Sequence, residues 1–355
     1  MDDNTRAFLK RLMEAVCPTG YEEDAARIWR QEAEGFADRT WSDVHGNSFA
    51  VVNEAGSPRV MLAGHIDEIG LMVTHIDKNG FLSFRPIGGW DPQILPGQRV
   101  RIRTDQGILI GVVGRKAIHL LEKEAREKVV KVKQLWVDIG ARDKEEAESL
   151  VRIGDPMVVD HGFATLRNDI ALARAFDDRI GAFVVLEAAR RLKDMNPDAA
   201  VYVVGTVQEE IGLRGAITSA FGIDPQVGIA VDVTHATDIP DAASDTGGEG
   251  DIAMGKGPVI TRGPNINRLL FDRMVNAAEA EKIPYQVQGA PRGTGTDANA
   301  LQLTRAGVAT GLIGIPNRYM HSPCELVHLG DVEAASRIIA HTVAGIGADS
   351  SFVLD

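Results

Sequence analysis

Cysteine is almost absent from this chain, and so is any long apolar run. Only Cys17 and Cys324 occur in 355 residues, too few to hold such a fold together by disulfides, so we expect a reducing, cytoplasmic location. No segment approaches the roughly 18 consecutive apolar residues of a membrane span. The opening residues, MDDNTRAFLKRLMEAV, lack the continuous apolar core of a secretion signal. These absences predict no membrane partner.

Positive charge is also scarce. The chain has 38 Lys and Arg against 50 Asp and Glu, which gives a formal net charge of -12. Such a deficit disfavours a nucleic-acid groove, so we expect no nucleic-acid partner. With 44% hydrophobic and 25% charged residues the composition is that of an ordinary globular protein, and the length favours two domains over one.

The middle of the chain differs in texture from its two ends. Between residues 70 and 166, short runs of β-type residues such as LMVTHI and ILIGVVG are separated by Gly, Pro, Asn and Asp, a pattern typical of a small β domain. Elsewhere helix-spaced segments alternate with apolar runs near Val201, Val227 and Ala309, which indicates an α/β sandwich with a mixed, largely parallel sheet. We predict a catalytic α/β domain formed by residues 1–69 and 167–355, with the β domain inserted into it.

Two adjacent acidic residues, Glu209 and Glu210, follow an apolar run that reads as a buried strand. Two like charges at a strand end are costly unless something positive offsets them. Other candidate metal ligands also lie at or just after the ends of expected strands, where open α/β sheets place their ligand crevices. The full set of candidate ligands is His65, Asp177, Glu210, Asp232 and His321.

This set of residues could hold two metal ions. Three carboxylates, two divalent ions and one bridging hydroxide sum to zero charge. Imidazole and carboxylate ligands without a thiolate favour zinc, cobalt or manganese over copper(I) or an iron–sulfur cluster. Asp177 is the predicted bridge, because it lies between the other ligands in the chain and opens a helix. We expect His65 and Asp232 to complete one ion's coordination, and Glu210 and His321 the other's.

Two further residues have predicted supporting roles. Glu209, adjacent to a ligand, is placed to take a proton from the bridging water and pass it to a leaving amine, as a general base does. Asp67, two residues after His65, is placed to accept the other N–H of that imidazole. Each motif alone has an ordinary interpretation, such as a helix N-cap for Asp177 and Asp178, and only the combination indicates a metal site.

Six motifs in order carry a family resemblance. GHIDEIG, AFDDRIG, TVQEEIGLRGA, VDVTHATDIP, GTGTDANA and RYMHSP together resemble the bacterial and archaeal tetrahedral aminopeptidases, a glutamyl-aminopeptidase-like family of cocatalytic metallopeptidases, over residues 8–348. The resemblance implies a zinc-exopeptidase-like fold and removal of N-terminal residues from short peptides with two divalent ions. It assigns the same ligands, Glu209 as the base and Asp67 as the residue that orients the histidine. It also implies a cis peptide bond between Asp177 and Asp178.

The resemblance extends to assembly. It implies that the inserted barrel-like β domain mediates dimerisation. Six dimers would then form a hollow tetrahedral dodecamer with inward-facing active sites. Folded proteins would be excluded from such a particle, and short peptides would enter.

Three other functions remain as alternatives. A deacylase acting on N-acyl amino acids would use the same metal centre. An endoglucanase-type glycosidase would place two carboxylates about 5 to 9.5 Å apart without metal, which would leave the histidines and Asp177 without a task. A non-enzymatic assembly protein would have no need of the ligands.

The preferred N-terminal side chain is left open by the sequence. Arg214, Arg262 and Arg292 could form a basic pocket for acidic residues, or could be surface or backbone-pairing arginines. Residues 293–297, GTGTD, are expected to form a loop near the pocket.

Overall fold

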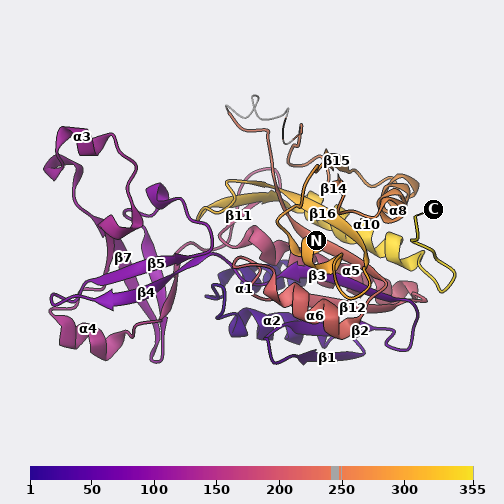
Figure 1. The fold of residues 1–355 in the computed structure, drawn as a ribbon, viewed down its shortest axis with the longest axis horizontal. Coiled ribbons are helices and arrows are strands. Elements are labelled where there is room, and N and C mark those ends of the chain that lie inside the picture. The colour runs from indigo at the N-terminus through magenta and orange to yellow at the C-terminus, as the bar shows by residue number, and fades with distance from the viewer. Residues whose placement is uncertain (241–247, 249, 355) are drawn as a thin grey trace.

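The computed structural model describes residues 1–240, 248 and 250–354 as an α/β sandwich with a smaller barrel beside it (Figure 1). The large sheet runs β1-β2-β12-β3-β13-β16-β17-β11-β10, with β14 and β15 attached beside β16. The barrel strands all fall between two strands of this sheet in the chain, β3 and β10. Both the fold class and the small barrel-like β domain are as predicted, and the barrel strands pair antiparallel.

Four parallel strands form the centre of the large sheet. They are β12 (Ala200–Thr206), β3 (Arg59–His65), β13 (Val227–His235) and β16 (Ala309–Arg318). Their sequences are nearly continuous apolar runs, as expected for strands that are covered on both faces. The parallel arrangement brings the carboxyl ends of β3, β12 and β13 to the same edge of the sheet.

Shorter strands close the sheet on both sides, and most of them pair antiparallel. They are β1 (Arg39–Ser42), β2 (Ser48–Val52), β10 (Ala164–Thr165), β11 (Ile170–Ala173), β14 (Val259–Arg262), β15 (Gln286–Gly289) and β17 (Glu325–His328). The sequence patterns did not predict β1, β10, β11, β14 or β17, because runs of two to four residues carry too little periodicity.

Helices cover both faces of the large sheet. A side chain at Gly64 in β3 would meet the backbone of α5. Gly228 in β13 is paired with Met61 of β3, and a side chain at Gly228 would meet Leu301 of α9. Because side chains alternate between the two faces of a strand, Met61 and Gly64, three positions apart, point to opposite faces, so α5 and α9 lie on opposite sides of the sheet. The helices of the sandwich are α1 (Asp3–Glu14), α2 (Glu23–Ala33), α5 (Phe176–Met195), α6 (Arg214–Ile223), α8 (Arg268–Ala280), α9 (Asp297–Leu301) and α10 (Leu329–Ala344).

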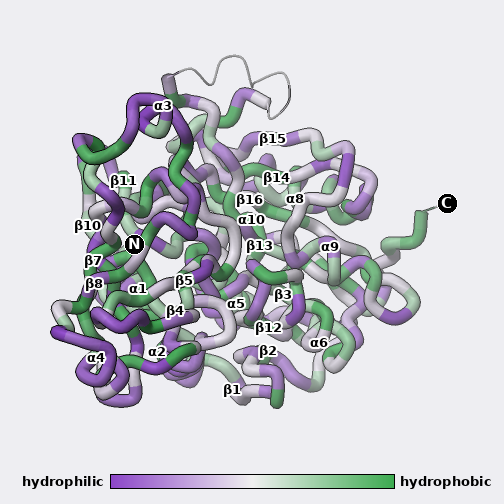
Figure 2. Tube along the Cα trace, turned by 60° about the vertical axis from the view of Figure 1, so that its left-hand side comes forward, coloured by the Kyte–Doolittle hydropathy of each residue, from purple (hydrophilic) through white to green (hydrophobic). Residues whose placement is uncertain are grey.

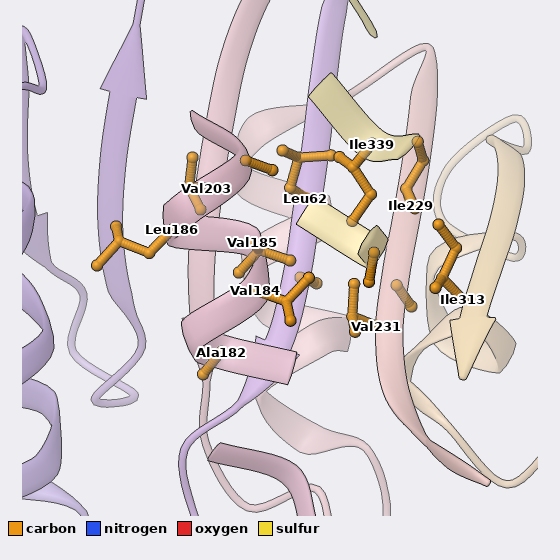
Figure 3. Packing of buried hydrophobic residues seen from close by; sticks show 14 of the residues in the cluster. Leu62, Ala182, Val184, Val185, Leu186, Val203, Ile229, Val231, Ile313 and Ile339 are labelled. Carbon is orange, nitrogen blue, oxygen red and sulfur yellow. The ribbon is translucent and has the colours of Figure 1, made fainter. Parts of the chain in front are cut away.

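The main core lies between the large sheet and the helices on the face that α5 covers. Leu62, Val203 and Ile229 from three central strands approach Val184 of α5 and Ile339 of α10 (Figure 3). All five side chains are fully buried. Helix α5 begins at Phe176, one residue before the Asp177 that was expected to open a helix, so its first turn includes Asp177 and Asp178.

The barrel has a core of its own, and its strands close in the order β4-β5-β8-β7-β6-β9. They are β4 (Gly70–Ile76), β5 (Leu82–Ile87), β6 (Arg99–Thr104), β7 (Gly107–Arg115), β8 (Leu135–Asp138) and β9 (Pro156–Val159). Two short helices, α3 (Lys123–Arg126) and α4 (Lys144–Leu150), lie at its periphery, and α4 is hydrophilic (Figure 2). Single 3-10 turns occur at Pro92–Ile94, Ile118–Leu120 and Val132–Gln134. Within the described ranges, no helix combines the length and apolarity needed to span a membrane.

The contact between β3 and α5 generates a stability prediction. A Cβ atom at Gly64 would lie 2.4 Å from the backbone of both Gly181 and Ala182, atoms that cannot move aside cheaply. We expect Gly64→Ala to lower the free energy of unfolding by about 1–3 kcal/mol or more. The matched control is Gly222→Ala in α6, where a Cβ meets nothing within 4 Å, and which should be neutral or stabilising by up to about 1 kcal/mol. Urea titration of both variants measures the difference, and equal stability of Gly64→Ala and wild type would contradict the packing described.

Candidate metal centre

A cavity of about 560 Å³ opens at the carboxyl edge of the central strands. Its lining combines acidic and imidazole side chains from segments far apart in the sequence. All five candidate ligands and the predicted base line it: His65, Asp177, Glu209, Glu210, Asp232 and His321. The predicted ligands and base therefore share one cavity, whereas Asp67 is not among its lining residues.

Asp177 lies between two histidines. Its Oδ1 atom is 3.2 Å from Nε2 of His65, and its Oδ2 atom is 3.1 Å from Nε2 of His321. The side chain of His65 is 2% exposed and that of His321 is 36% exposed, so one side of the carboxylate faces the interior and the other faces the cavity. A carboxylate with an imidazole at each oxygen has the donor arrangement of a bridging ligand.

The two glutamates approach different histidines. Oε1 of Glu210 is 3.4 Å from Nε2 of His321, and Oε2 of Glu209 is 3.8 Å from Nε2 of His65. Both residues follow β12 by a few positions rather than ending it, because the intervening Gln208 has a left-handed backbone with φ of 55°. The turn aims the adjacent carboxylates at different sides of Asp177.

Asp232 lies inside β13 rather than at its end, since the strand continues to His235. Ligand atoms of His65, Asp178 and Asp232 lie within 4.8 Å of one another, as do those of His65, Asp177 and Glu210. Asp178 thus approaches the site, but its Oδ2 accepts the backbone N–H of His65 and its Oδ1 that of Gly181. Because both oxygens are engaged, we interpret Asp178 as a brace. The peptide bond between Asp177 and Asp178 is cis, as the resemblance implies.

Asp67 is a buried carboxylate that accepts several hydrogen bonds next to the site. Its carboxylate accepts the backbone N–H groups of Glu209 and Glu210 and the hydroxyl of Thr19. Its Oδ1 is 3.4 Å from Nδ1 of His65, but that nitrogen has no hydrogen-bond partner among the described residues. The predicted bond to the imidazole is thus a close approach, and the hydrogen bonds of Asp67 come from the Thr19 hydroxyl at 2.8 Å and from the two backbone amides at 3.1 and 3.2 Å.

Two buried acidic residues at the site were missed from the sequence. Glu22 accepts the backbone N–H groups of Gly20 and Gln208, and Glu325 accepts those of Asp177 and His321. Both side chains are less than a tenth exposed. The only signal in the sequence was that Glu325 lies close to a predicted ligand. Its partners are backbone amides, which every residue except proline has, so they cannot be recognised from the sequence.

A buried ion-pair network supports the same segments. Glu68, one residue after Asp67, contacts the guanidinium groups of Arg174 and Arg179. Arg179 also donates to the carbonyl of Ile66 and to carbonyls at the end of α1, including that of Ala15. The network ties the end of β3 to the start of α5, which are the segments that carry His65 and Asp177.

The electrostatics of the cluster show an excess of buried negative charge. Burial raises the pKa of Glu209 to about 10. Burial, together with repulsion from Asp177, raises the pKa of Asp232 well above its usual range. Hydrogen bonding to Asp177 and Glu210 raises the pKa of His321 to about 11. In the absence of metal, these pKa values rise because the described residues of the cluster bring several carboxyl groups together with only two imidazoles.

Divalent cations fit this set of donors. Among the described residues, buried Oε1 of Glu210 has no hydrogen bond of good geometry and only the 3.4 Å approach of Nε2 of His321, and two groups of three ligand atoms lie close enough together to share an ion. The donors are imidazole nitrogen and carboxylate oxygen, which suit zinc, cobalt or manganese. Positive charge would also offset the repulsion that raises the carboxyl pKa values.

The opposite wall of the cavity comes from loop and strand residues with little charge. The expected loop contributes residues 293–296, and Arg292 lies beside it with an exposed side chain. Arg262 lies over the ring of Phe271 instead, and neither it nor Arg214 is among the lining residues. Of the three arginines considered for a basic pocket, only Arg292 lines the cavity in the described part of the chain.

Comparison with known proteins gives a consistent family. A family model described as M42 glutamyl aminopeptidase matches residues 46–338. The lysyl aminopeptidase of Pyrococcus furiosus is 42% identical over 332 residues, which cover 92% of this chain and 93% of that protein.

Solved structures agree with the sequence comparison. A TET aminopeptidase from a marine sediment archaeon of the Thaumarchaeota has a TM-score of 0.92 at 38% identity, covering 98% of both chains. The TET1 peptidase of Pyrococcus horikoshii, described as able to assemble into a tetrahedron or a large octahedral shell, has a TM-score of 0.86 at 33% identity over 96% of this chain and 100% of that one. The family model and these relatives cover most of the sequence, and the chain therefore belongs to the M42 glutamyl aminopeptidase family.

Proposed function

We propose that this protein is an aminopeptidase with two divalent cations that removes N-terminal residues from short peptides by hydrolysis. The observation that carries the proposal is the position of Asp177, whose two oxygens lie within 3.2 Å of two different histidines. Family membership supports the reaction class. The mechanism, the ligands and the number of ions are our inference from the geometry.

In the proposed site, His65, Asp177 and Asp232 hold one cation, and Asp177, Glu210 and His321 hold the other. When bound, the ions would polarise the scissile carbonyl and make water a stronger nucleophile near neutral pH. Zinc or cobalt is our first expectation, and manganese is compatible with the same donors.

Glu209 is the proposed general base. It lines the cavity and is 3.8 Å from Nε2 of His65, yet it is not needed in either ligand set. Its raised pKa makes it a strong proton acceptor, and positive charge at the ligands lowers that pKa toward the neutral range, where one group can both accept and donate. Glu209 would take a proton from water and deliver it to the departing amine. Asp67 positions it through the backbone N–H of Glu209.

An aminopeptidase must also recognise a free α-ammonium group. Since the ligand carboxylates and a hydroxide balance the two proposed cations, Glu209 is the lining carboxylate whose negative charge is left to attract such a group. Water-excluded carboxylates interact with a cation more strongly than exposed ones do. Neutral, N-acylated substrates would gain nothing from this charge, which favours aminopeptidase over deacylase activity.

We also propose self-association through the barrel, taking residues 70–166 as an inserted dimerisation domain and residues 1–69 and 167–355 as the catalytic domain. On β7 the side chains of Ile108, Ile110 and Val112 alternate outward and are 44–48% exposed. An exposed apolar row of this kind is suited to contact with a second subunit. Together with the assembly described for the Pyrococcus horikoshii relative, it supports dimers that build a tetrahedral dodecamer. Both cysteines are free, which fits a reducing cytoplasm.

The reaction class can be tested with chromogenic amides of several amino acids, each assayed with zinc, cobalt or manganese and with a chelated control. We expect hydrolysis of amides with a free N-terminus, loss of activity on chelation and recovery when metal is restored. N-acetylated versions of the same amides serve as the control. Faster hydrolysis of the acetylated series would favour the deacylase, and activity that resists chelation would exclude the metal mechanism.

The role of Glu209 can be tested by Glu209→Gln. Removing the base should lower kcat by about 10²- to 10⁴-fold, because proton transfer by a positioned side chain contributes rate of that order. The bound metal, measured by elemental analysis, should stay at the wild-type amount, since Glu209 is not a proposed ligand. Glu148→Gln, at an exposed site on α4, is the control for loss of one carboxylate. A rate within a few-fold of wild type would remove Glu209 from the mechanism.

The chelated protein should lose stability as the pH rises from about 5 to 9. Glu209, with a pKa of about 10, keeps in the folded state a proton that the unfolded chain releases above about pH 4. His321, with a pKa of about 11, contributes stability that is full below about pH 6.5 and is lost above it. Both effects have the same sign, so the unfolding midpoint should fall across this range. Zinc should reduce the fall, and a midpoint of chelated protein that rises with pH would contradict the proposed charge balance.

A further inference from the structure

Glu325 joins the backbones of two proposed ligands that lie far apart in the chain. Its Oε2 accepts the N–H of Asp177 and its Oε1 accepts the N–H of His321, both at 3.0 Å. The side chain is 2% exposed, so neither bond competes with bulk water. One rigid carboxylate therefore fixes the relative position of the two segments.

The strand pairing explains why this residue reaches both segments. Glu325 begins β17, which lies between β11 and β16 in the sheet. Glu325 is opposite Ala173, at the end of the strand that leads into α5, and its neighbour Leu326 is opposite Arg318, at the end of the strand that leads to His321. The two chains that emerge from β11 and β16 thus pass on either side of Glu325.

Both segments have backbone conformations that regular structure does not hold. Asp177 has φ of -80° and ψ of 105° inside the first turn of α5, where N–H groups have no intrahelical partner. His321 is left-handed, with φ of 59°. Without Glu325 the buried N–H of Asp177 and the partly buried N–H of His321 would lose these partners, and each segment would be free to take another conformation.

We propose that Glu325 is a positioning residue that sets the spacing between the Asp177 carboxylate and the His321 imidazole. Its larger effect would fall on the cation held by Asp177, Glu210 and His321, because both segments that Glu325 holds supply ligands to that ion, whereas only Asp177 serves the other. The inference rests on the ligand sets of the proposed function. It adds a residue that touches neither cation nor substrate.

The test compares Glu325→Gln with Asp331→Asn. The amide of Glu325→Gln keeps the size of the side chain but accepts only one of the two N–H groups, since its NH₂ end is a donor. Asp331 is the matched control, because it is also 2% exposed and accepts two backbone N–H groups, those of Gly255 and Gly257. It is not among the residues that line the cavity. Zinc alone is titrated into each chelator-stripped protein by calorimetry, and thermal unfolding is recorded in parallel.

We expect wild type to bind two zinc ions per chain. Glu325→Gln should bind one of them about 10- to 100-fold more weakly, in line with other residues that orient ligands, and the other with a smaller loss, because that ion shares only Asp177 with the segments that Glu325 holds. Asp331→Asn should lower the unfolding midpoint and leave both affinities at wild-type values. Excess zinc should restore most of the kcat of Glu325→Gln, because the base and the ligands are intact.

Other outcomes separate the two levels of inference. If Glu325→Gln binds both ions like wild type and only its unfolding midpoint falls, Glu325 is merely structural and the inference is wrong. If wild type itself does not bind two ions, the proposed function fails, and this inference fails with it. Glu325→Asp, which keeps the charge but shortens the reach, provides a second variant should Glu325→Gln not fold. It should weaken the same ion, and unchanged binding would again overturn the proposal.

Discussion

Buried negative charge is the constraint on which the rest of this structure depends. Buried carboxylates from six separate segments meet at one edge of a parallel sheet, where water screens them poorly. Isolated burial of each would be costly, so every one of them requires a donor or a positive charge. The structure meets this need in two ways. The carboxylates among the proposed ligands, which we call inner, face imidazoles. The buried carboxylates around them, which we call outer, accept backbone N–H groups.

The outer carboxylates fix the loops that carry the proposed ligands by accepting their backbone N–H groups. Gln208, Glu209, Glu210 and His321 all lie in turns, and each of their N–H groups is held by a buried carboxylate. Asp232 needs no such support, because it lies within β13 and is opposite Gly314 in the ladder. Backbone bonds to carboxylates thus appear where the sheet ends and the ligands continue. The carboxylates that serve this purpose are Glu22, Asp67, Asp178 and Glu325.

The parts of this arrangement that the sequence predicts are those with a side-chain signature. Apolar runs followed by His65 or by Glu209 mark strand ends, and the types of donor atom restrict the choice of metal. The acidic and imidazole residues that line the cavity could therefore be predicted from the sequence. Glu22 and Glu325 could not be found in this way, because their partners are main-chain amides that any residue supplies. The position of Asp232 within its strand was also missed, since Val233 and His235 do not distinguish a strand from the loop after it.

Under the proposed ligand sets, the two cations would have unequal surroundings. His65 ends a central strand and Asp232 lies within another, so the first set of ligands is held mainly by the hydrogen-bond ladder of the sheet. Glu210 and His321 lie on turns, and the 36% exposed imidazole of His321 faces the cavity. Ligand geometry at the second ion therefore depends on side chains such as Asp67 and Glu325 rather than on the ladder. Ligands held by the hydrogen-bond ladder can shift only if the sheet opens, whereas ligands on a turn can shift when a single supporting carboxylate moves. Metal affinity at the second site, whose ligands lie on turns, can therefore change without loss of the fold.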